Sequence, residues 1–301
     1  MRIFVTGASG YVGSAVAAAC ARAGHQVSGL VRDDEKARRL RRMEVLPVPG
    51  SMQEPASWLG AARDAQVVVH CAAEYSADLF ELDRRTVEEC LANARSGRTR
   101  LFVYTSGVWL YGSTGAEAVD ESAPLDPAPM VAPRAEIEQE VLAANADGLR
   151  TLVLRPGCVY GGRGGLTAAW FESASTVGVA RIVGEGTNRW AMVHRADLAD
   201  AYLRAIESPF GGEVFNVTDR SRFTVRECAA AASRAAGAGG RVAAWPVAEA
   251  AREIGPMAEA LALDQHVDSS KAVRLLGWQP RHGGFVDGAA RYHAAWSAAR
   301  T

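Results

Sequence analysis

The sequence predicts a doubly wound α/β fold, in which a parallel sheet carries helices on both of its faces. Short apolar runs alternate with helical patterns through the first half of the 301-residue chain. These runs are apolar on both faces, which is typical of buried parallel strands. A glycine-rich turn also joins the first run to the first helical pattern.

Six predicted strands and the helices between them follow this alternation in order. The strands are expected at residues 3–6, 26–31, 45–48, 67–70, 100–105 and 151–155. The clearest helices between them are expected at 11–24 and 87–96. After residue 160 the pattern becomes irregular: residues 194–207 predict a strong helix, 212–218 predict one more strand, and 222–301 predict Ala-rich helices joined by loops.

Composition excludes several classes of protein and partner. Hydrophobic residues make up 49% of the chain and charged residues 22%, which is typical of a soluble globular protein. The formal net charge of −1 gives no reason to expect nucleic acid or an anionic membrane as a partner. No apolar run reaches the roughly 18 residues that span a bilayer. The sequence starts directly with a strand and leaves no room for a signal peptide, so we expect a cytoplasmic protein.

The number and spacing of the cysteines are consistent with a cytoplasmic location. The five cysteines are odd in number, widely spaced and without a Cys-x-x-Cys pair. This argues against a disulfide framework or a zinc site and fits a reducing environment, and we expect no metal site. Cys71 and Cys158 lie near strand ends and are interpreted as small core residues.

A glycine-rich turn carries the first functional signal. The segment TGASGYVG, residues 6–13, follows the first strand and opens the first helix. Gly7 allows the tight turn, Gly10 lets the backbone approach a pyrophosphate, and Gly13 lets the helix pack close to the sheet. The helix N-terminus then presents N–H groups and a positive dipole end to the phosphates. This context predicts a dinucleotide-binding Rossmann fold.

The end of the second strand indicates which dinucleotide is bound. An acidic residue there would hold the ribose 2′-hydroxyl of NAD, whereas an arginine suits the 2′-phosphate of NADP. Arg32 comes directly after the strand, ahead of Asp33 and Asp34, and Lys36 or Arg38 could assist it. Alternatively, these charges only solvate a helix start that Asp34 caps. We expect NADP, with NAD as the alternative.

Six collinear segments resemble the extended branch of the short-chain dehydrogenase/reductase superfamily, which contains epimerases, dehydratases and reductases. They are TGASGYVG (6–13), HCAA (70–73), YTSGVWLYG (104–112), LRPGCVYG (154–161), MVHRADLADAYLRAIE (192–207) and LGWQPR (276–281). The resemblance covers nearly the whole chain. It implies a dinucleotide-binding Rossmann core at 1–161 and about 190–220, and a smaller substrate lobe at about 162–189 and 221–301. A two-helix dimer face is common in this superfamily, so a homodimer is one expected form.

The resemblance also implies which residues contact the dinucleotide. They lie in the glycine turn and at the ends of the following strands, and are Thr6, Gly7, Ser9, Gly10, Tyr11, Val12, Gly13, Arg32, Cys71, Ala72, Ala73, Thr105, Ser106, Arg134, Pro156 and Gly157.

The chain departs from the family at its catalytic Tyr-x-x-x-Lys pair. Met130 and Arg134 occupy those two positions, and Gly107 stands where the family has a third catalytic residue, a serine or threonine. No other register supplies the pair, because none of the seven tyrosines stands four residues before either of the two lysines, Lys36 and Lys271. The chain therefore resembles atypical members of the superfamily.

Replacement catalytic groups are expected from Tyr75, Ser106, Arg134 and His194. Arg134 could hold the ribose or a substrate oxygen but cannot donate a proton, because its pKa is too high. Simpler interpretations remain: Tyr75 as an aromatic pocket wall, His194 as a structural residue and Arg134 as an exposed helix residue. The expected substrate pocket comprises Tyr75, Gly107, Trp109, Met130, Val159, Trp170 and Trp190, although most of the tryptophans could be core.

The favoured function is an NADP-dependent oxidoreductase that reduces a small carbonyl or an activated double bond with a non-standard proton donor. Hydride transfer belongs to the cofactor, so loss of the tyrosine does not exclude it. Two alternatives remain: a non-redox isomerase, cyclase or lyase, and an NADP(H)-sensing regulator without turnover. The full-length substrate lobe favours an enzyme with a small-molecule substrate.

Overall fold

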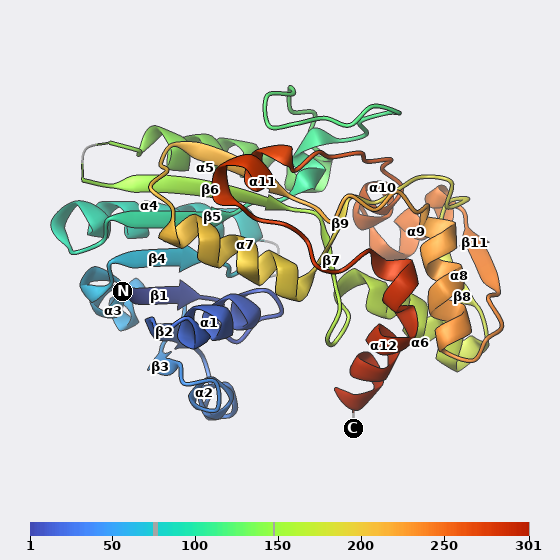
Figure 1. Ribbon diagram of the computed structural model, residues 1–301, viewed down its shortest axis with the longest axis horizontal. Coiled ribbons are helices and arrows are strands. Elements are labelled where there is room, and N and C mark those ends of the chain that lie inside the picture. The colour runs from blue at the N-terminus through green and yellow to red at the C-terminus, as the bar shows by residue number, and fades with distance from the viewer. Residues whose placement is uncertain (75–77, 147, 301) are drawn as a thin grey trace. The chain divides into compact units, whose positions relative to one another are not determined.

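The computed structural model describes residues 1–74, 78–146 and 148–300 (Figure 1). Among these residues the main sheet has seven strands in the order β10-β6-β5-β4-β1-β2-β3. They are β1 (Arg2–Thr6), β2 (Gln26–Val31), β3 (Leu46–Pro49), β4 (Val67–His70), β5 (Leu101–Thr105), β6 (Arg150–Pro156) and β10 (Glu213–Val217). Within the described ranges, no helix is both long enough and apolar enough to cross a bilayer.

The sheet is parallel where β1, β2, β3, β4, β5 and β6 pair with one another. The strand order runs outward from β1 in two directions, which confirms the expected doubly wound topology. The first turn after β1 therefore lies at the point where the order reverses, the usual ligand-binding edge of such sheets. The predicted strands agree with the observed ones to within one residue at each end.

Helices connect these strands. They are α1 (Gly13–Arg22), α2 (Asp34–Arg41), α3 (Leu59–Asp64), α4 (Leu79–Ser96), α5 (Pro133–Ala143) and α7 (Arg195–Glu207), with the short 3₁₀ turn η1 (Pro55–Ser57) before α3. Figure 1 shows α1 and α7 in front of the sheet. The apolar residues of both sheet faces are covered in this way, and β4 and β5 are almost fully buried.

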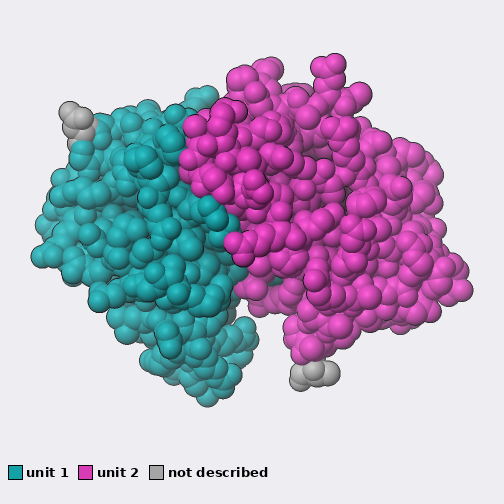
Figure 2. Space-filling model, in the orientation of Figure 1, with its two compact units in different colours: residues 1–106, 133–155, 199–215 teal, residues 107–132, 156–198, 216–301 magenta. Residues whose placement is uncertain are grey.

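The chain divides into two compact units (Figure 2). Unit 1 contains residues 1–106, 133–155 and 199–215, and unit 2 contains residues 107–132, 156–198 and 216–301. This differs from the division expected from the sequence, mainly because 107–132 belongs to unit 2. Its backbone is tied there: the N–H of Thr114 donates to the carbonyl of Asp264, and the N–H of Val119 donates to that of His266. No local sequence pattern signals such a distant pairing.

Unit 2 contains two small parallel ladders, β7 with β9 and β8 with β11. Its strands are β7 (Cys158–Tyr160), β8 (Ala180–Val183), β9 (Met192–His194) and β11 (Val242–Trp245). Its helices are α6 (Ala168–Val177), α8 (Val225–Ala235), α9 (Val247–Ile254), α10 (Met257–Leu261), α11 (Ser270–Leu276) and α12 (Phe285–Ala298), with 3₁₀ turns η2 (Val108–Tyr111), η3 (Pro129–Val131) and η4 (Gly165–Thr167). Thr224 and Glu227 start α8 with a capping box, which satisfies two backbone donors reciprocally.

The core of unit 2 is aromatic. The rings of Trp170 and Trp190 stack with centroids 4.9 Å apart, and only 3% and 8% of these residues' surfaces are exposed. The indole N–H of Trp190 donates to the carbonyl of Leu261. Both tryptophans, which the sequence placed in the substrate pocket, therefore pack as core residues, because their large apolar surfaces close the space between α6, α12 and β9.

Candidate active site

The glycine turn after β1 is as tight as its sequence predicts. Gly7 has φ +67°, and a Cβ there would lie 2.7 Å from the Cα of Ala72. A Cβ on Gly13 would lie 2.3 Å from the carbonyl oxygen of Gly7. Two of the three glycines are thus required by close backbone contacts. Gly10 instead closes the turn, because its N–H donates to the carbonyl of Gly7 at 2.8 Å.

The N-terminus of α1 is suited to an anion. No side chain caps this helix, and its first turn contains no acidic residue. The positive end of the helix dipole is therefore not neutralised by the helix itself. Together with the tight turn, this arrangement fits the pyrophosphate of a dinucleotide, which the backbone around Gly10 and Gly13 would hold.

The end of β2 presents an arginine. The guanidinium of Arg32 lies 2.9 Å from the carboxylate of Glu74, and its side chain is 57% exposed. Asp33, and not Asp34, caps α2, because its carboxylate accepts the N–H of Lys36 at 2.8 Å. Hydrogen bonds from Lys36 also lower the pKa of Asp33. The carboxylate of Asp33 is therefore used to cap α2, and Arg32 is the side chain at this strand end that can bind a ligand.

The two positions at which the resemblance implies a catalytic pair fall in different units. Met130 lies in η3 of unit 2, and Arg134 lies in the first turn of α5 in unit 1. Arg134 is half-buried, which is unlike the exposed helix residue considered above. Its guanidinium carbon lies 5.5 Å from the ring centroid of Phe80, and its Nε is buried without a hydrogen-bond partner among the described residues. Arg134 therefore has an unused donor inside unit 1.

A buried polar network joins the ends of β1, β4 and β5. His70 Nδ1 lies 2.6 Å from the hydroxyl of Thr6, and His70 Nε2 lies 2.7 Å from the carboxylate of Asp83. Tyr104 donates its hydroxyl to the other oxygen of that carboxylate at 2.6 Å. Burial alone would raise the pKa of Asp83, but hydrogen bonds from His70 and Tyr104 and the charge of Arg134 lower it. Asp83 is therefore a buried carboxylate at neutral pH.

Sequence reasoning missed this network, although one signal was present. Asp83 stands between Leu82 and Val87 on the apolar face of α4, where an unpaired charge would be costly. A lone acidic residue on such a face indicates a buried partner. His70, at the end of a buried strand, was the available one.

A pair of hydrogen-bonded hydroxyl groups lies at the end of β5. The hydroxyls of Thr105 and Tyr202 are 2.6 Å apart, and Thr105 also donates to the carbonyl of His70 at 2.7 Å. Tyr202 comes from α7 and was not predicted. Burial and the nearby Cys71 raise the pKa of Tyr202 well above its ordinary value, so it stays protonated. Next to this pair, the hydroxyl of Ser106 is buried and has no partner within the described structure.

The cysteines near the strand ends do not supply a nucleophile. Burial raises the pKa of Cys71 to about 11 and that of Cys158 to about 12. Both thiols therefore remain protonated at neutral pH, as expected of small core residues.

His194 belongs to unit 2 and has structural partners there. Its ring stacks on that of His282 with centroids 3.5 Å apart, and its Nδ1 accepts the N–H of Ala196 at the start of α7. Asp197 lies 3.0 Å from His282 Nδ1. Burial and the adjacent His282 lower the pKa of His194 to about 4. Donor atoms of His194, Asp197 and His282 lie within 4.8 Å of one another. Each of the three residues already makes a hydrogen bond within the protein. We therefore interpret the group as a structural cluster and not as a metal site.

The remaining predicted residues divide between the units. Tyr75 lies outside the described residues. Ser9, Tyr11, Val12 and Ala73 belong to unit 1 with the glycine turn, whereas Gly107, Trp109, Pro156, Gly157 and Val159 belong to unit 2. Gly157 is required by packing, because a Cβ there would lie 2.5 Å from the carbonyl oxygen of Ala191.

Comparison with known proteins identifies the family. A model of the NAD dependent epimerase/dehydratase family matches residues 3–218. The chain belongs to this family. It is 32% identical to the 4-hydroxy-2-methyl-3-oxo-4-farnesyl-3,4-dihydroquinoline-1-oxide ketoreductase of Stigmatella aurantiaca over 235 residues, which cover 75% of this chain and 70% of that protein. It is 29% identical to the 3-diazoavenalumate denitrifying reductase of a Streptomyces species over 307 residues, covering 97% and 100% of the two chains.

A solved structure shows the same fold. A double mutant of the dTDP-glucose 4,6-dehydratase from Streptomyces venezuelae, determined with NAD, matches with a TM-score of 0.84 and 22% identity. The match covers 100% of this chain and 98% of that one. Fold and family membership together confirm the resemblance drawn from the motifs. This family member is thus an enzyme of the nicotinamide-dinucleotide-dependent oxidoreductase or epimerase type.

Proposed function

We propose that the protein is an NADP(H)-preferring reductase of a small carbonyl compound or an activated double bond. The observation that carries the cofactor preference is the exposed Arg32 at the end of β2, beside an Asp33 that caps α2. An arginine at this position suits a ribose 2′-phosphate, and the carboxylate that NAD would require is engaged elsewhere. Both relatives with named activities described above are reductases, which supports the reaction type.

Binding of NADP(H) would exchange one partner of Arg32 for another. Its present partner is Glu74, and an exposed ion pair of this kind contributes about 0–1 kcal/mol. A charge-assisted hydrogen bond to a phosphate is stronger, and the planar guanidinium can form two of them. Replacement of the Glu74 carboxylate by the 2′-phosphate as the partner of Arg32 therefore favours binding of NADP(H).

The residues of unit 1 supply binding and polarisation. The bound cofactor supplies the hydride. Arg134 would donate hydrogen bonds from its unused donor to a ribose or substrate oxygen, and Ser106 would use its unpartnered hydroxyl in the same way. Arg134 cannot act as the acid. The proton donor is then a group other than a Tyr-x-x-x-Lys tyrosine, with Tyr75 and Ser106 as the candidates.

Exchange of Arg32 tests the cofactor preference. In the Arg32→Asp variant we expect the Kd for NADPH to rise roughly tenfold or more, since a hydrogen bond to a charged group contributes about 1.5–3 kcal/mol. The Kd for NADH should stay nearly constant. Arg39→Asp is the matched control, because Arg39 is an exposed arginine of α2 paired with Glu35. An unchanged NADPH/NADH preference in Arg32→Asp would refute the proposal.

The reaction type has a separate test. NADPH consumption is followed at 340 nm with a panel of small ketones, aldehydes and enones, and the products are identified by mass spectrometry. Stoichiometric oxidation of NADPH with a reduced product supports a reductase. Product formation without any net change in NADPH would show a non-redox enzyme instead.

A further inference from the structure

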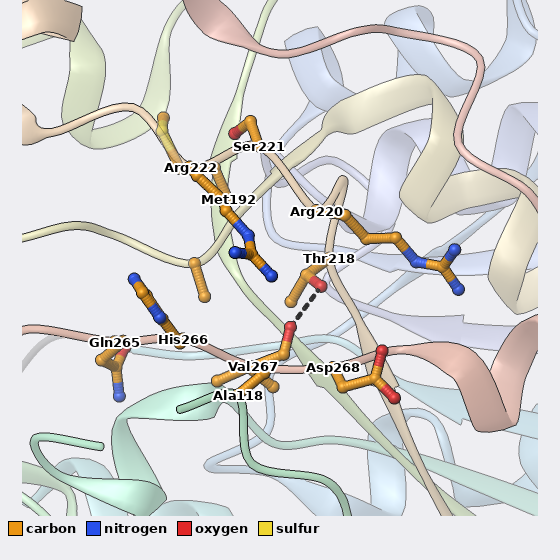
Figure 3. Close-up of a pocket in the computed structure, with 11 residues that line it drawn as sticks. Ala118, Met192, Thr218, Arg220, Ser221, Arg222, Gln265, His266, Val267 and Asp268 are labelled. Atoms are coloured by element: carbon orange, nitrogen blue, oxygen red, sulfur yellow. Dashed lines mark hydrogen bonds between the residues drawn. The ribbon is translucent and has the colours of Figure 1, made fainter. Parts of the chain in front are cut away.

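Unit 2 contains a pocket of about 120 Å³ whose lining residues all belong to that unit. The loop after β10 forms one side of it and the segment 265–268 another (Figure 3). Its volume accommodates several water molecules, so a small organic group can enter. Neither the dinucleotide site in unit 1 nor any predicted substrate residue accounts for this pocket.

Arg222 contributes a free positive charge to the pocket. Arg222 is an exposed residue whose carbonyl accepts a hydrogen bond from Arg189, and within the described part of the chain its guanidinium makes no hydrogen bond or ion pair. In Figure 3 this guanidinium extends into the middle of the pocket, between His266 and Thr218. A guanidinium in this position can pair with an anionic group that enters the pocket.

His266 contributes an unused hydrogen-bond acceptor. Its Nδ1 lies 2.9 Å from the carbonyl oxygen of Ala116, so Nδ1 carries the proton that this bond requires. The opposite nitrogen, Nε2, is buried and has no hydrogen-bond partner in the described part of the chain. In the neutral ring that nitrogen is an acceptor, and a hydroxyl group satisfies it.

The other charges of the pocket limit the charge of the ligand. Arg220 extends away from Arg222 in Figure 3, and its guanidinium lies 3.5 Å from the hydroxyl of Ser270. The carboxylate of Asp268 accepts the same hydroxyl at 2.7 Å. Arg222 is therefore the guanidinium that extends into the pocket, and Asp268 is an acidic side chain in the same lining, so the site matches a single negative charge. The planar guanidinium also pairs with a carboxylate through two parallel hydrogen bonds.

Apolar atoms complete the wall. Ala118, Met192 and Val267 line the pocket beside the polar groups. They would contact a short carbon skeleton that carries the carboxylate and the hydroxyl. A dianionic phosphate, by contrast, would bring a second charge and three oxygens to a pocket into which one guanidinium extends.

We infer that this pocket binds a small hydroxycarboxylate, with its carboxylate on Arg222 and its hydroxyl on His266 Nε2. The inference rests on the proposed function in one respect: it gives the substrate or product of the reductase a chemical class. Binding itself requires no dinucleotide. The two ideas can therefore fail separately.

The first test is a binding titration with the full chain, followed by ¹H–¹⁵N spectra of the amides at 218–222 and 265–268. The probes are lactate, propionate without the hydroxyl, methyl lactate without the charge, and inorganic phosphate. We expect saturable shifts with lactate, weaker binding of propionate and none of methyl lactate. Equal binding of methyl lactate, tighter binding of phosphate, or no saturable binding of lactate would overturn the inference.

Variants assign the two contacts. Arg222→Gln should weaken lactate roughly tenfold or more, because it removes a charged hydrogen-bond partner. The matched control Arg220→Gln removes the same charge two residues away and should change the Kd less than about twofold. Equal effects of the two variants would mean that lactate responds only to the overall positive charge near the pocket and makes no direct contact with Arg222. That result would contradict the inference.

His266→Asn addresses the hydroxyl contact. The asparagine amide can still donate toward Ala116, whereas the Nε2 acceptor is removed. We expect lactate and propionate to bind this variant equally, with propionate unchanged from the wild type. If lactate keeps its advantage, the assigned contact is wrong. Lactate binding without any NADPH-dependent turnover would support the inference about the pocket and count against the proposed reductase activity. Turnover without lactate binding would support the reductase activity and contradict the inference about the pocket.

Discussion

The hydroxyl of Tyr202 lies 2.6 Å from that of Thr105, although the two residues are 97 positions apart. Thr105 has one hydroxyl proton, which it donates to the carbonyl of His70, so the protonated hydroxyl of Tyr202 donates to Thr105. This chain of hydrogen bonds ties α7 to the carboxyl ends of β4 and β5. Ser106, the next residue along, takes no part in it, and its buried hydroxyl has no partner in the part of the chain that the structure describes.

The contrast between Ser106 and Thr105 predicts opposite behaviour on substitution. Ser106→Ala removes a hydroxyl that has no partner among residues 1–74, 78–146 and 148–300, so we expect the free energy of unfolding to be unchanged or slightly increased. Thr105→Val removes the hydrogen bonds of Thr105 with the hydroxyl of Tyr202 and the carbonyl of His70 and should cost about 1–3 kcal/mol. Urea denaturation measures both changes. A large loss of stability in Ser106→Ala would show a structural role and remove it from the list of catalytic candidates.

The carboxylate of Asp83 is expected to be a main stabilising group of unit 1. Asp83→Ala leaves His70 Nε2 and the hydroxyl of Tyr104 buried without an acceptor. We expect a loss of about 3–5 kcal/mol in the free energy of unfolding, the usual cost of breaking a buried charged network. Asp78→Ala is the control, because Asp78 is exposed and its side chain makes no capping hydrogen bond. A loss below about 1 kcal/mol for Asp83→Ala would contradict this account.

Local sequence patterns predicted well those elements whose conformation is determined by residues close together in the sequence. The strands are short, apolar on both faces and separated by turns, and the glycine turn follows from backbone contacts within a few residues and one neighbouring strand. Helix caps were less certain: Asp33 and Asp34 are both good capping residues, and only the backbone conformation decides between them.

The elements that local patterns missed depend on contacts between distant residues. Tyr202 reaches Thr105 from another helix, and Asp83 meets His70 only when α4 packs on the sheet. Likewise, Trp170 stacks on Trp190 because two segments of unit 2 fold together. A large aromatic residue has the same sequence signal in a core as in a pocket, so composition alone could not separate the two.

The glycine turn gives a prediction that combines stability with cofactor binding. Gly13→Ala places a Cβ 2.3 Å from the carbonyl oxygen of Gly7, which the backbone must move to avoid. We expect dinucleotide binding to be lost and stability to fall by about 1–3 kcal/mol. Gly60→Ala, in α3, meets nothing within 4 Å and should be neutral or stabilising by up to about 1 kcal/mol. Calorimetric titration with NADPH and urea denaturation test the pair, and normal binding by Gly13→Ala would contradict the assigned role.

The His194–His282 pair predicts how stability depends on pH. Burial and the charge of His282 lower the pKa of His194 to about 4, and Arg291 and Arg195 act in the same direction, whereas Asp197 opposes them. The unfolded chain therefore takes up a proton near pH 6.5, before the folded chain does. The stabilisation contributed by neutral His194 is complete above about pH 6.5 and is lost as the pH falls toward 4. Because His194 is partly exposed, we discount the loss to the order of 1 kcal/mol.

His194→Asn isolates this contribution. Asparagine keeps an acceptor for the N–H of Ala196, since it is a favourable N-cap residue, but it does not titrate. We expect the wild type to lose more stability than the variant between pH 7 and pH 5, as measured by urea midpoints at both values. His25→Asn serves as a control because His25 belongs to unit 1, whereas the stacked pair belongs to unit 2. If His194→Asn loses as much stability as the wild type over this range, protonation of His194 does not govern the acid sensitivity of unit 2.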